Sequence, residues 1–415
     1  MISQDKAWNM KLVSQNTLEG FGGIGEGMGI QLTSDGRRIM WLAHEGAPKN
    51  FSGVDVTDIK NPRVIVQTEL PHDHVRSNSL EVTGDIMAVA YQCWKSADQF
   101  GVPGFNEQPA GFELFDISTP ESPKSISFFD CSGPYSMGVH QLWFADGEYV
   151  HLAGGAPDFE PNNPNDNQFY RCIDVRNPSK PEEVGRWWYP GTRKGDSEAP
   201  PERHPTFDSG FRAHNTNVYP DRPDRCYLAY LDGGMFILDI ADKSKPKAIS
   251  SWNPHPPYPG FMHTVLPLLE RDLLIVTDES ITDGASDWPK LTWVIDARKE
   301  DNLIPISTLP MPPVEAYRNL GGRFGSHNLH ENRPGPAYRS NNIIFSTFFS
   351  GGVRAYDLTN PYQPQEIAYF VPKAPEGSRA GAIQINDVFV DENQIVYAVD
   401  RFAGGLYILE MEIDI

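Results

Sequence analysis

The sequence predicts an all-β protein, a seven-bladed β-propeller with four-stranded blades. We expect residues 1–415 to form this propeller as a single domain. Three observations lead to this fold class. A unit of about sixty residues recurs along the chain. Each unit consists of short runs of strand-forming residues between turns. The chain also contains 36 glycines and 36 prolines, which favour many turns over long helices.

The clearest copy of the repeat begins at His214. It reads HNTNVYP, RCYLAYLDGG, MFILDIADKSKP and KAISSWN, which predicts four strands separated by turns. The third strand of each copy ends in an aspartate, and successive aspartates are 61, 58, 65, 57 and 61 residues apart. We expect each carboxylate to accept backbone N–H groups of the following turn. These aspartates are Asp55, Asp116, Asp174, Asp239, Asp296 and Asp357.

The blade boundaries follow from this repeat. The seventh unit, QINDVFVDENQIVYAVDRFAGGLYILEM, supplies only three strands. We expect residues 9–20 to add its fourth strand, because MKLVS has strand character and such a closure pairs both chain ends in one sheet. The expected blades are 25–69, 75–130, 137–189, 212–253, 262–310, 325–371 and 382–412.

Segments such as YLDGGMFILDIADKSKP and LLIVTDES resemble the LVIVD-repeat β-propellers. The resemblance covers most of the chain. It implies the fold but no particular reaction, because one fold can carry many functions.

A histidine occupies the same starting position in the innermost strand of four consecutive blades, in HQLWF, HNTNV, HTVLP and HNLHE. The alignment puts Gln384, Ser77 and a glycine near Gly27 at this position in the other three blades. Innermost strands line the central channel, so the four imidazoles can converge on a transition metal. Alternatively, each histidine is a hydrogen-bonding residue of the channel wall. The four predicted metal ligands are His140, His214, His263 and His327.

Long insertions belong to two loop types that open on one face of a propeller. They cover 93–111, 155–169 and 279–291 within blades, and 190–212, 313–326 and 371–381 between blades. We expect 93–111, 155–169, 190–212 and 279–291 to surround one funnel that leads to the axial site. Its expected apolar walls include Trp94, Phe100, Phe159 and Trp288.

Four arginines precede innermost strands and form the predicted substrate-binding group: Arg76, Arg212, Arg323 and Arg379. Guanidinium groups at the channel mouth could clamp a carboxylate or a similar anion. Alternatively, they pair with acidic residues of neighbouring loops such as Asp73, Glu202 and Asp208.

Candidate acid–base residues lie in the same loops. We single out Glu45 and Glu279, together with His74 of PHDHVRSNS, where His72 and His74 could also be an exposed pair. Further candidates, which the sequence does not rank, are Asp158, Asp232, Asp278 and Arg401.

Composition excludes several classes of function. A net charge of −20 disfavours nucleic acid as a partner. No apolar run is long enough to span a bilayer, and the first residues show no secretory pattern. The four cysteines are widely spaced without a CxxC pair, so we expect reduced thiols and a cytoplasmic protein. Nucleotide-binding and hydrolase-elbow motifs are absent, and we interpret GFGGIGEGMG at 20–29 as turn sequence leading into a strand.

A four-histidine axial site on a seven-bladed propeller resembles the carotenoid-cleaving oxygenases and the selenium-binding protein family, which includes copper-dependent thiol oxidases. The resemblance rests on blade number and histidine arrangement, not on flanking motifs. From carotenoid cleavage it implies that the four histidines hold Fe(II) with positions open for dioxygen. Our first hypothesis is therefore a metal-dependent oxygenase (a dioxygenase) or oxidase of a small organic substrate, with Cu, Zn or Mn as alternative metals.

Two other functions remain open. One is a hydrolase, lyase or isomerase in which the cation is a Lewis acid and Glu45 or Glu279 is the base. The other is a noncatalytic propeller that binds a ligand or a protein on the same face. The sequence leaves the substrate and the oligomeric state open.

Overall fold

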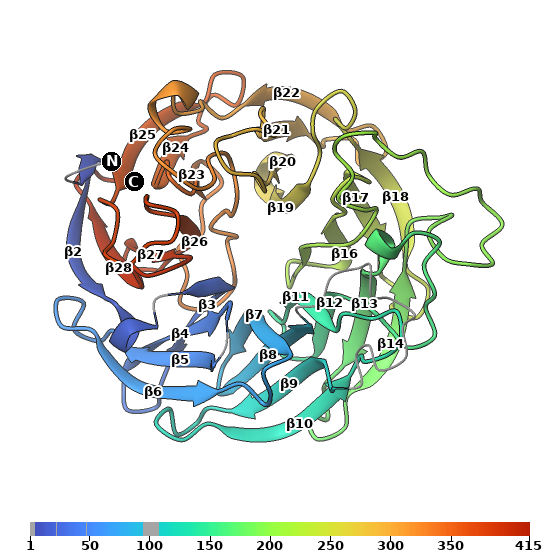
Figure 1. Ribbon diagram of the computed structural model, residues 1–415, viewed down its shortest axis with the longest axis horizontal. Coiled ribbons are helices and arrows are strands. Elements are labelled where there is room, and N and C mark those ends of the chain that lie inside the picture. Colours follow the sequence, from blue (N-terminus) through green and yellow to red (C-terminus); the bar gives the residue numbers. More distant parts are fainter. Residues whose placement is uncertain (1–4, 22, 47, 94–107) are drawn as a thin grey trace.

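A computed structural model describes residues 5–21, 23–46, 48–93 and 108–415. Seven antiparallel sheets stand around a central axis as the blades of a propeller (Figure 1). The predicted fold class is confirmed. The strands of the first four blades run, from the axis outward, as β3 (Ile24–Leu32), β4 (Arg38–His44), β5 (Lys49–Asp55) and β6 (Arg63–Glu69); β7 (Val75–Thr83), β8 (Ile86–Cys93), β9 (Gly111–Asp116) and β10 (Lys124–Asp130); β11 (Val139–Trp143), β12 (Tyr149–Gly154), β13 (Phe169–Asp174) and β14 (Glu182–Trp187); and β15 (Thr216–Tyr219), β16 (Arg222–Ala229), β17 (Met235–Asp239) and β18 (Lys247–Trp252).

The last three blades continue the ring in the same order. Their strands are β19 (Met262–Leu268), β20 (Leu273–Asp278), β21 (Thr292–Asp296) and β22 (Ile304–Thr308); β23 (Ile343–Thr347), β24 (Val353–Asp357), β25 (Gln365–Val371) and β1 (Lys6–Trp8); and β26 (Ile385–Val390), β27 (Ile395–Asp400), β28 (Leu406–Met411) and β2 (Met10–Asn16). Short 3-10 helices in the described part of the chain are Leu18–Gly20, Pro164–Asp166, Leu269–Arg271 and Val314–Ala316.

The N-terminal segment closes the ring as predicted. Strand β2 pairs antiparallel with β28, from Met10 opposite Met411 to Asn16 opposite Leu406. The sequence did not predict that β1 would pair with β25 and so extend the sixth blade. Asn9 joins the two strands with a φ of 54°, a left-handed conformation that asparagine tolerates better than most residues.

The innermost segment of the sixth blade is irregular. Its backbone still bonds to β23, with His327 N donating to Thr347 O at 3.1 Å and His330 N donating to Phe345 O at 3.0 Å. This blade therefore has five hydrogen-bonded layers, counting β1 at its outer edge.

Inner and outer strands differ in how far their side chains are buried. Strand β20 is buried throughout because neighbouring blades cover both of its faces, whereas the outer strand β22 is partly exposed. The six repeat aspartates also behave as expected. Each accepts a hydrogen bond from the backbone N–H two residues later, at distances from 2.7 to 3.0 Å.

All four cysteines are buried. Among the described residues, no helix combines the length and the apolar character that crossing a membrane requires.

Candidate metal centre

Four imidazoles meet near the propeller axis. They come from blades three to six, and the ring centroids of successive histidines are 4.4, 3.9 and 4.5 Å apart. The Nε2 atoms of His140 and His214 are 2.8 Å apart. His214, His263 and His327 are buried and His140 is partly buried. The structure thus brings together the four histidines that the repeat alignment singled out.

Strand irregularities aim two of these side chains, those of His140 and His263, inward. The register of β11 with β12 shifts between Val139 and Gln141, so His140 is an extra residue in its strand. His263 is placed in the same way by a shift between Met262 and Thr264. A bulge bends the strand and re-aims the side chain, which is why bulges are frequent beside active sites.

The far side of each ring is held by a hydrogen bond. Amide or backbone carbonyl oxygens face the Nδ1 atoms of His140, His214 and His327, and such oxygens only accept. These Nδ1 atoms therefore carry the proton, and their Nε2 lone pairs point toward the axis. The four Nδ1 partners, in chain order, are Gln92 Oε1 at 2.9 Å, Asn215 Oδ1 at 2.8 Å, Thr264 Oγ1 at 2.8 Å and Asn386 O at 2.7 Å.

Glu26 completes the cluster, and sequence reasoning missed it. Its carboxylate oxygens lie 3.4 Å from His263 Nε2, 3.5 Å from His327 Nε2 and 3.9 Å from His214 Nε2. The repeat alignment had assigned this position to a glycine near Gly27. The sequence signal for this position is the triplet GEG, a charged residue between two glycines. The structure explains the glycines, because a Cβ on Gly25 or Gly27 would come within 2.4 or 2.2 Å of the backbone of β7. Residues 24–29 lie in β3, so most of the glycine-rich stretch is strand rather than turn.

Glu279 directly follows β20 and also reaches the cluster. Its oxygens lie 3.5 Å from His327 Nε2 and 3.8 Å from His263 Nε2, and Arg323 Nη1 donates to it at 2.7 Å. The sequence named this residue as an acid–base candidate, and the structure places it beside the histidines.

The protonation states suit a cation. Burial alone would raise the pKa of Glu26, but His263 and His327 hold that pKa well below its usual value. Burial lowers the pKa of His214 to about 3 and also lowers the pKa values of His140 and His327. Burial opposes protonation of His263 as well, but Glu26 raises its pKa. At neutral pH the cluster therefore offers an ionised carboxylate and at least three neutral imidazoles.

The residues present fit a metal ion. Among the described residues, His263 Nε2, His327 Nε2 and Glu26 Oε2 are buried without a hydrogen-bond partner. The lone pairs of His140 and His214 repel each other at 2.8 Å unless a cation or a proton lies between them. A cation held among them would satisfy several of these atoms together. Three overlapping groups have ligand atoms within 4.8 Å of one another: Glu26, His140 and His214; Glu26, His263 and His327; and His214, His263 and Glu279.

A cavity of about 270 Å³, here called the inner cavity, adjoins the cluster. His140, His214, Glu26 and Glu279 contribute to its wall. Four arginines also line it: Arg76, Arg212, Arg323 and Arg401. The first three belong to the predicted substrate-binding group.

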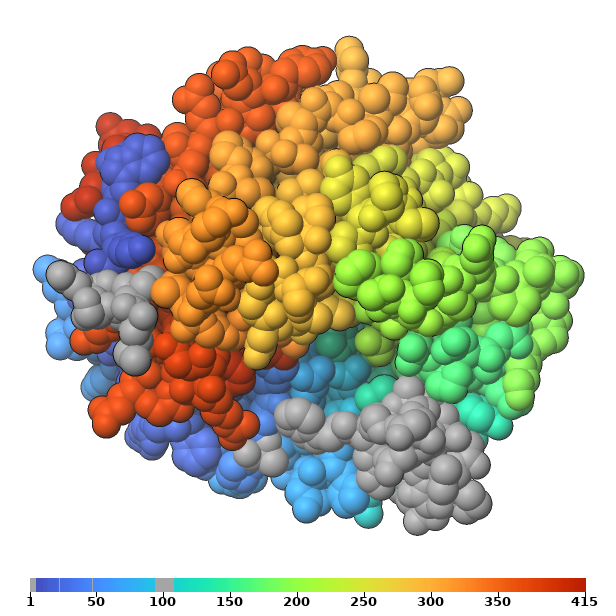
Figure 2. Space-filling model, turned by 45° about the horizontal axis from the view of Figure 1, so that its top comes forward, coloured from blue at the N-terminus to red at the C-terminus, as the bar shows by residue number. Residues whose placement is uncertain are grey.

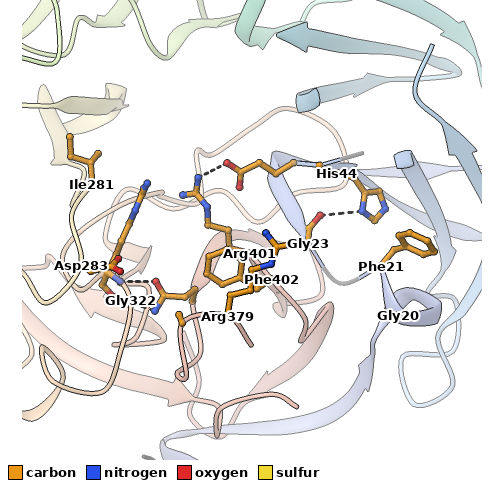
Figure 3. A pocket seen from close by; sticks show the side chains of 15 residues that line it. Gly20, Phe21, Gly23, His44, Ile281, Asp283, Gly322, Arg379, Arg401 and Phe402 are labelled. Carbon is orange, nitrogen blue, oxygen red and sulfur yellow. Dashed lines mark hydrogen bonds and ion pairs between the residues drawn. The ribbon is translucent and has the colours of Figure 1, made fainter. Parts of the chain in front are cut away.

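A larger outer cavity of about 590 Å³ shares Glu45, Ile281, Arg323 and Arg401 with the inner one. The fourth predicted arginine, Arg379, lies in its wall rather than in the inner cavity (Figure 3). The molecular surface is hollowed on this face between the yellow and blue segments (Figure 2).

Ion pairs organise the arginines. Glu45 accepts hydrogen bonds from both Arg76 and Arg401, and Arg76 also donates to Gln92 Oε1 at 2.8 Å. Burial lowers the pKa of Arg212. Asp208, one of the expected alternative partners, pairs with Arg203 instead.

Other predicted residues lie away from the two cavities. The side chain of His74 is 43% exposed, 3.5 Å from Asp73, and belongs to neither lining. His72 Nε2 contacts the carbonyl of Pro109. Three of the acid–base candidates accept hydrogen bonds outside the cavities. Asp158 accepts from Arg186, Asp232 from the N–H groups of Ser209 and Gly210, and Asp278 from Trp293 Nε1.

The predicted funnel needs one correction. Residues at the ends of its loops, such as Gln168, Arg212 and Glu279, do line one cavity. Phe159, however, stacks on Phe169 at 4.2 Å, and Trp288 stacks on Phe324 at 5.8 Å, so neither forms its wall. Apolar lining comes instead from Phe21, Met137, Phe261, Ile281 and Phe402. Trp94 and Phe100 lie outside the described residues.

Comparison of the sequence with models of known protein families gave no match, and a search of curated proteins gave none. The resemblance to LVIVD-repeat propellers and to the two four-histidine families therefore rests on the repeat and on the histidine arrangement alone.

Proposed function

We propose that this propeller is a metal-dependent oxygenase or oxidase of a small organic molecule. Its metal, with Fe(II) favoured over Cu, Zn and Mn, would be held by His140, His214, His263 and His327. The proposal is carried by four imidazoles that meet at the axis, three of them with Nε2 lone pairs directed toward it, and by the overlapping ligand groups that they form with Glu26 and Glu279. Imidazole and carboxylate ligands suit iron, and no cysteine belongs to the ligand groups found among the described residues.

The chain's own residues would prepare the site for this chemistry. When bound, a redox-active divalent metal would supply the means to react with dioxygen. Glu26 offsets part of its charge, and the hydrogen bonds to the Nδ1 atoms fix the rings. Arg323 holds Glu279 beside the histidines, where the carboxylate can accept or return a proton.

The position of Glu279 also favours a second candidate. A buried carboxylate beside a Lewis-acidic cation is the arrangement used by metal-dependent hydrolases, lyases and isomerases. For either reaction we place the protein in a reducing cytoplasm, which is supported by its four buried cysteines and their wide spacing in the sequence.

Elemental analysis of freshly purified protein tests the proposal. We expect one transition metal per chain and a loss of at least tenfold in metal content for His140→Ala. His151→Ala is the matched control, since His151 is buried in the same blade but its Nδ1 atom is hydrogen-bonded to the Tyr170 hydroxyl. It should keep its metal.

The identity of the metal then separates the candidates. Iron or copper with substrate-dependent oxygen uptake supports an oxygenase or oxidase. Activity with zinc or manganese and without oxygen uptake would replace it with the Lewis-acid reaction. Protein without metal, even after incubation with iron, would overturn both in favour of a noncatalytic binding propeller.

A further inference from the structure

The inner cavity contains one arginine that its carboxylates do not neutralise. Glu45 pairs with Arg76 and Arg401, and Glu279 pairs with Arg323. In the described part of the chain, no hydrogen bond or ion pair reaches Arg212, and its Nε atom is buried without a partner. Asp232 and Asp166 favour the charge of Arg212 from a distance, but neither contacts it as an ion pair. The cavity therefore contains a guanidinium without a direct partner beside the histidines.

An unpaired buried guanidinium destabilises a folded protein, because burial removes its hydration and nothing replaces it. Arg212 lies two residues before His214, so its placement is tied to the metal centre. Arg401 adds a second unsatisfied donor to this cavity, since its Nη1 is buried without a partner. Both observations indicate that an anion binds here. A carboxylate suits it because its two oxygens match the paired N–H groups of a guanidinium.

The outer cavity indicates what the anion is attached to. It continues from the inner cavity past Ile281 and Arg401, and Phe21 and Phe402 add apolar surface (Figure 3). In this view Arg401 lies between Ile281 on one side and Phe21 on the other. An inorganic anion would fill only the inner part, whereas an organic acid could occupy both cavities.

We propose that the two cavities bind an organic carboxylate, with its carboxylate on Arg212 and its apolar body directed toward Phe21 and Phe402. That this ligand is the substrate rests on the proposed function. The carboxylate site itself does not, because the arginine and the cavities are present whether or not the centre takes up a metal.

Calorimetric titration tests this site with 3-phenylpropanoate, the neutral 3-phenylpropanamide and sulfate as probes. We expect the carboxylate to bind wild-type protein at least tenfold more tightly than the amide or sulfate. Arg212→Met should weaken carboxylate binding at least tenfold and leave the melting temperature equal or higher, because it removes an unpaired charge. Arg298→Met, which alters an exposed arginine, should bind as wild type does.

Each titration is made on metal-free and on metal-loaded protein. Unchanged carboxylate affinity in Arg212→Met overturns the inference, and so does equal affinity for the amide. Equal affinity for sulfate would reduce the site to one for inorganic anions. If Arg212→Met loses carboxylate binding but the wild-type protein takes up no metal, the carboxylate site is supported and the proposed enzyme is refuted. If the protein takes up metal but Arg212→Met binds the carboxylate as wild type does, the proposed enzyme is supported and the carboxylate site is refuted.

Discussion

A second buried charge cluster lies along the channel, beyond the histidines. Glu81 on β7 and Glu331 each contact Arg333 at 2.8 Å, and Asp387 on β26 lies near them. Burial raises the pKa of Glu81 to about 8 and that of Asp387 to about 7, in spite of the attraction of Arg333. The three carboxylates share one arginine, and retaining a proton limits their mutual repulsion.

These shifts make stability depend on pH. An unfolded glutamate titrates near pH 4.3, whereas Glu81 in the folded chain keeps its proton up to about pH 8. Between these values the native state binds more protons, so its free energy of unfolding falls as pH rises. We expect Glu81→Gln to flatten this fall by about 1–3 kcal/mol between pH 5 and pH 8, on the scale of roughly 1.4 kcal/mol per pKa unit.

Urea unfolding at several pH values measures this difference. Glu121→Gln is the control, because Glu121 lies at the surface and pairs with Arg37. It should keep the wild-type slope. A Glu81→Gln variant with an unchanged slope would mean that the glutamate is already ionised in the folded protein.

Individual residues also show how far the sequence could predict the site. The four histidines share a repeat position, so alignment of the blades found them. Glu26 could not be found in this way, because the register of β3 with β4 is irregular between Ile24 and Met28. Across such an irregularity, the position of a residue in the strand no longer tells which face its side chain points to. Arg401 and Glu45 were named, but their ion pair depends on loops from different blades.

At the scale of elements, the aspartate that ends each third strand is the most regular feature of the blades. It was predictable because the interaction is local, spanning two residues. Asp116 shows it in its simplest form, with Oδ1 accepting from Ser118 N at 2.9 Å. The side chain of Ser118 and then this backbone hydrogen bond lower the pKa of Asp116.

We expect Asp116→Ala to reduce the free energy of unfolding by about 1 kcal/mol, the usual net value of one such hydrogen bond. Asp116→Asn retains an acceptor oxygen and should stay within about 0.5 kcal/mol of wild type, a range typical of benign surface changes. Chemical denaturation of both variants checks this. Equal losses in the two would show that charge, rather than the hydrogen bond, matters there.

The whole ring positions the metal centre through its closure. Asn386 on the seventh blade accepts from His327 Nδ1 with its backbone oxygen. Its side-chain nitrogen donates to the carbonyls of Ile24 at 3.1 Å and Gly25 at 2.9 Å. One residue thus ties a histidine of the sixth blade to the strand of the first blade that carries Glu26. The geometry of the site depends on the contact between the last blade and the first.

This dependence can be separated from the general effect of trimming the chain. Removing residues 1–8 deletes β1, whose three side chains are exposed, and leaves β2 in place. We expect a small loss of stability, from the few backbone hydrogen bonds to β25, and no change in metal affinity. Removing residues 1–16 also deletes β2 and with it the buried side chain of Met10 and the backbone pairing of β28. The cost should be about 3 kcal/mol or more, from burial of Met10 and about 1 kcal/mol for each lost hydrogen bond.

The longer deletion should weaken metal binding as well, although no proposed ligand is removed. Without β2, the seventh blade packs less firmly, and Asn386 no longer holds His327 and the Glu26 strand at a fixed separation. We expect the affinity for Fe(II), measured by competition with a chelator at a temperature where both variants are folded, to fall at least tenfold relative to the shorter deletion, as losses of outer hydrogen bonds at metal sites commonly do. If the longer deletion unfolds more readily but binds the metal as tightly as wild type does, ring closure stabilises the fold without shaping the site. His327 and Glu26 would then be positioned by their own blades.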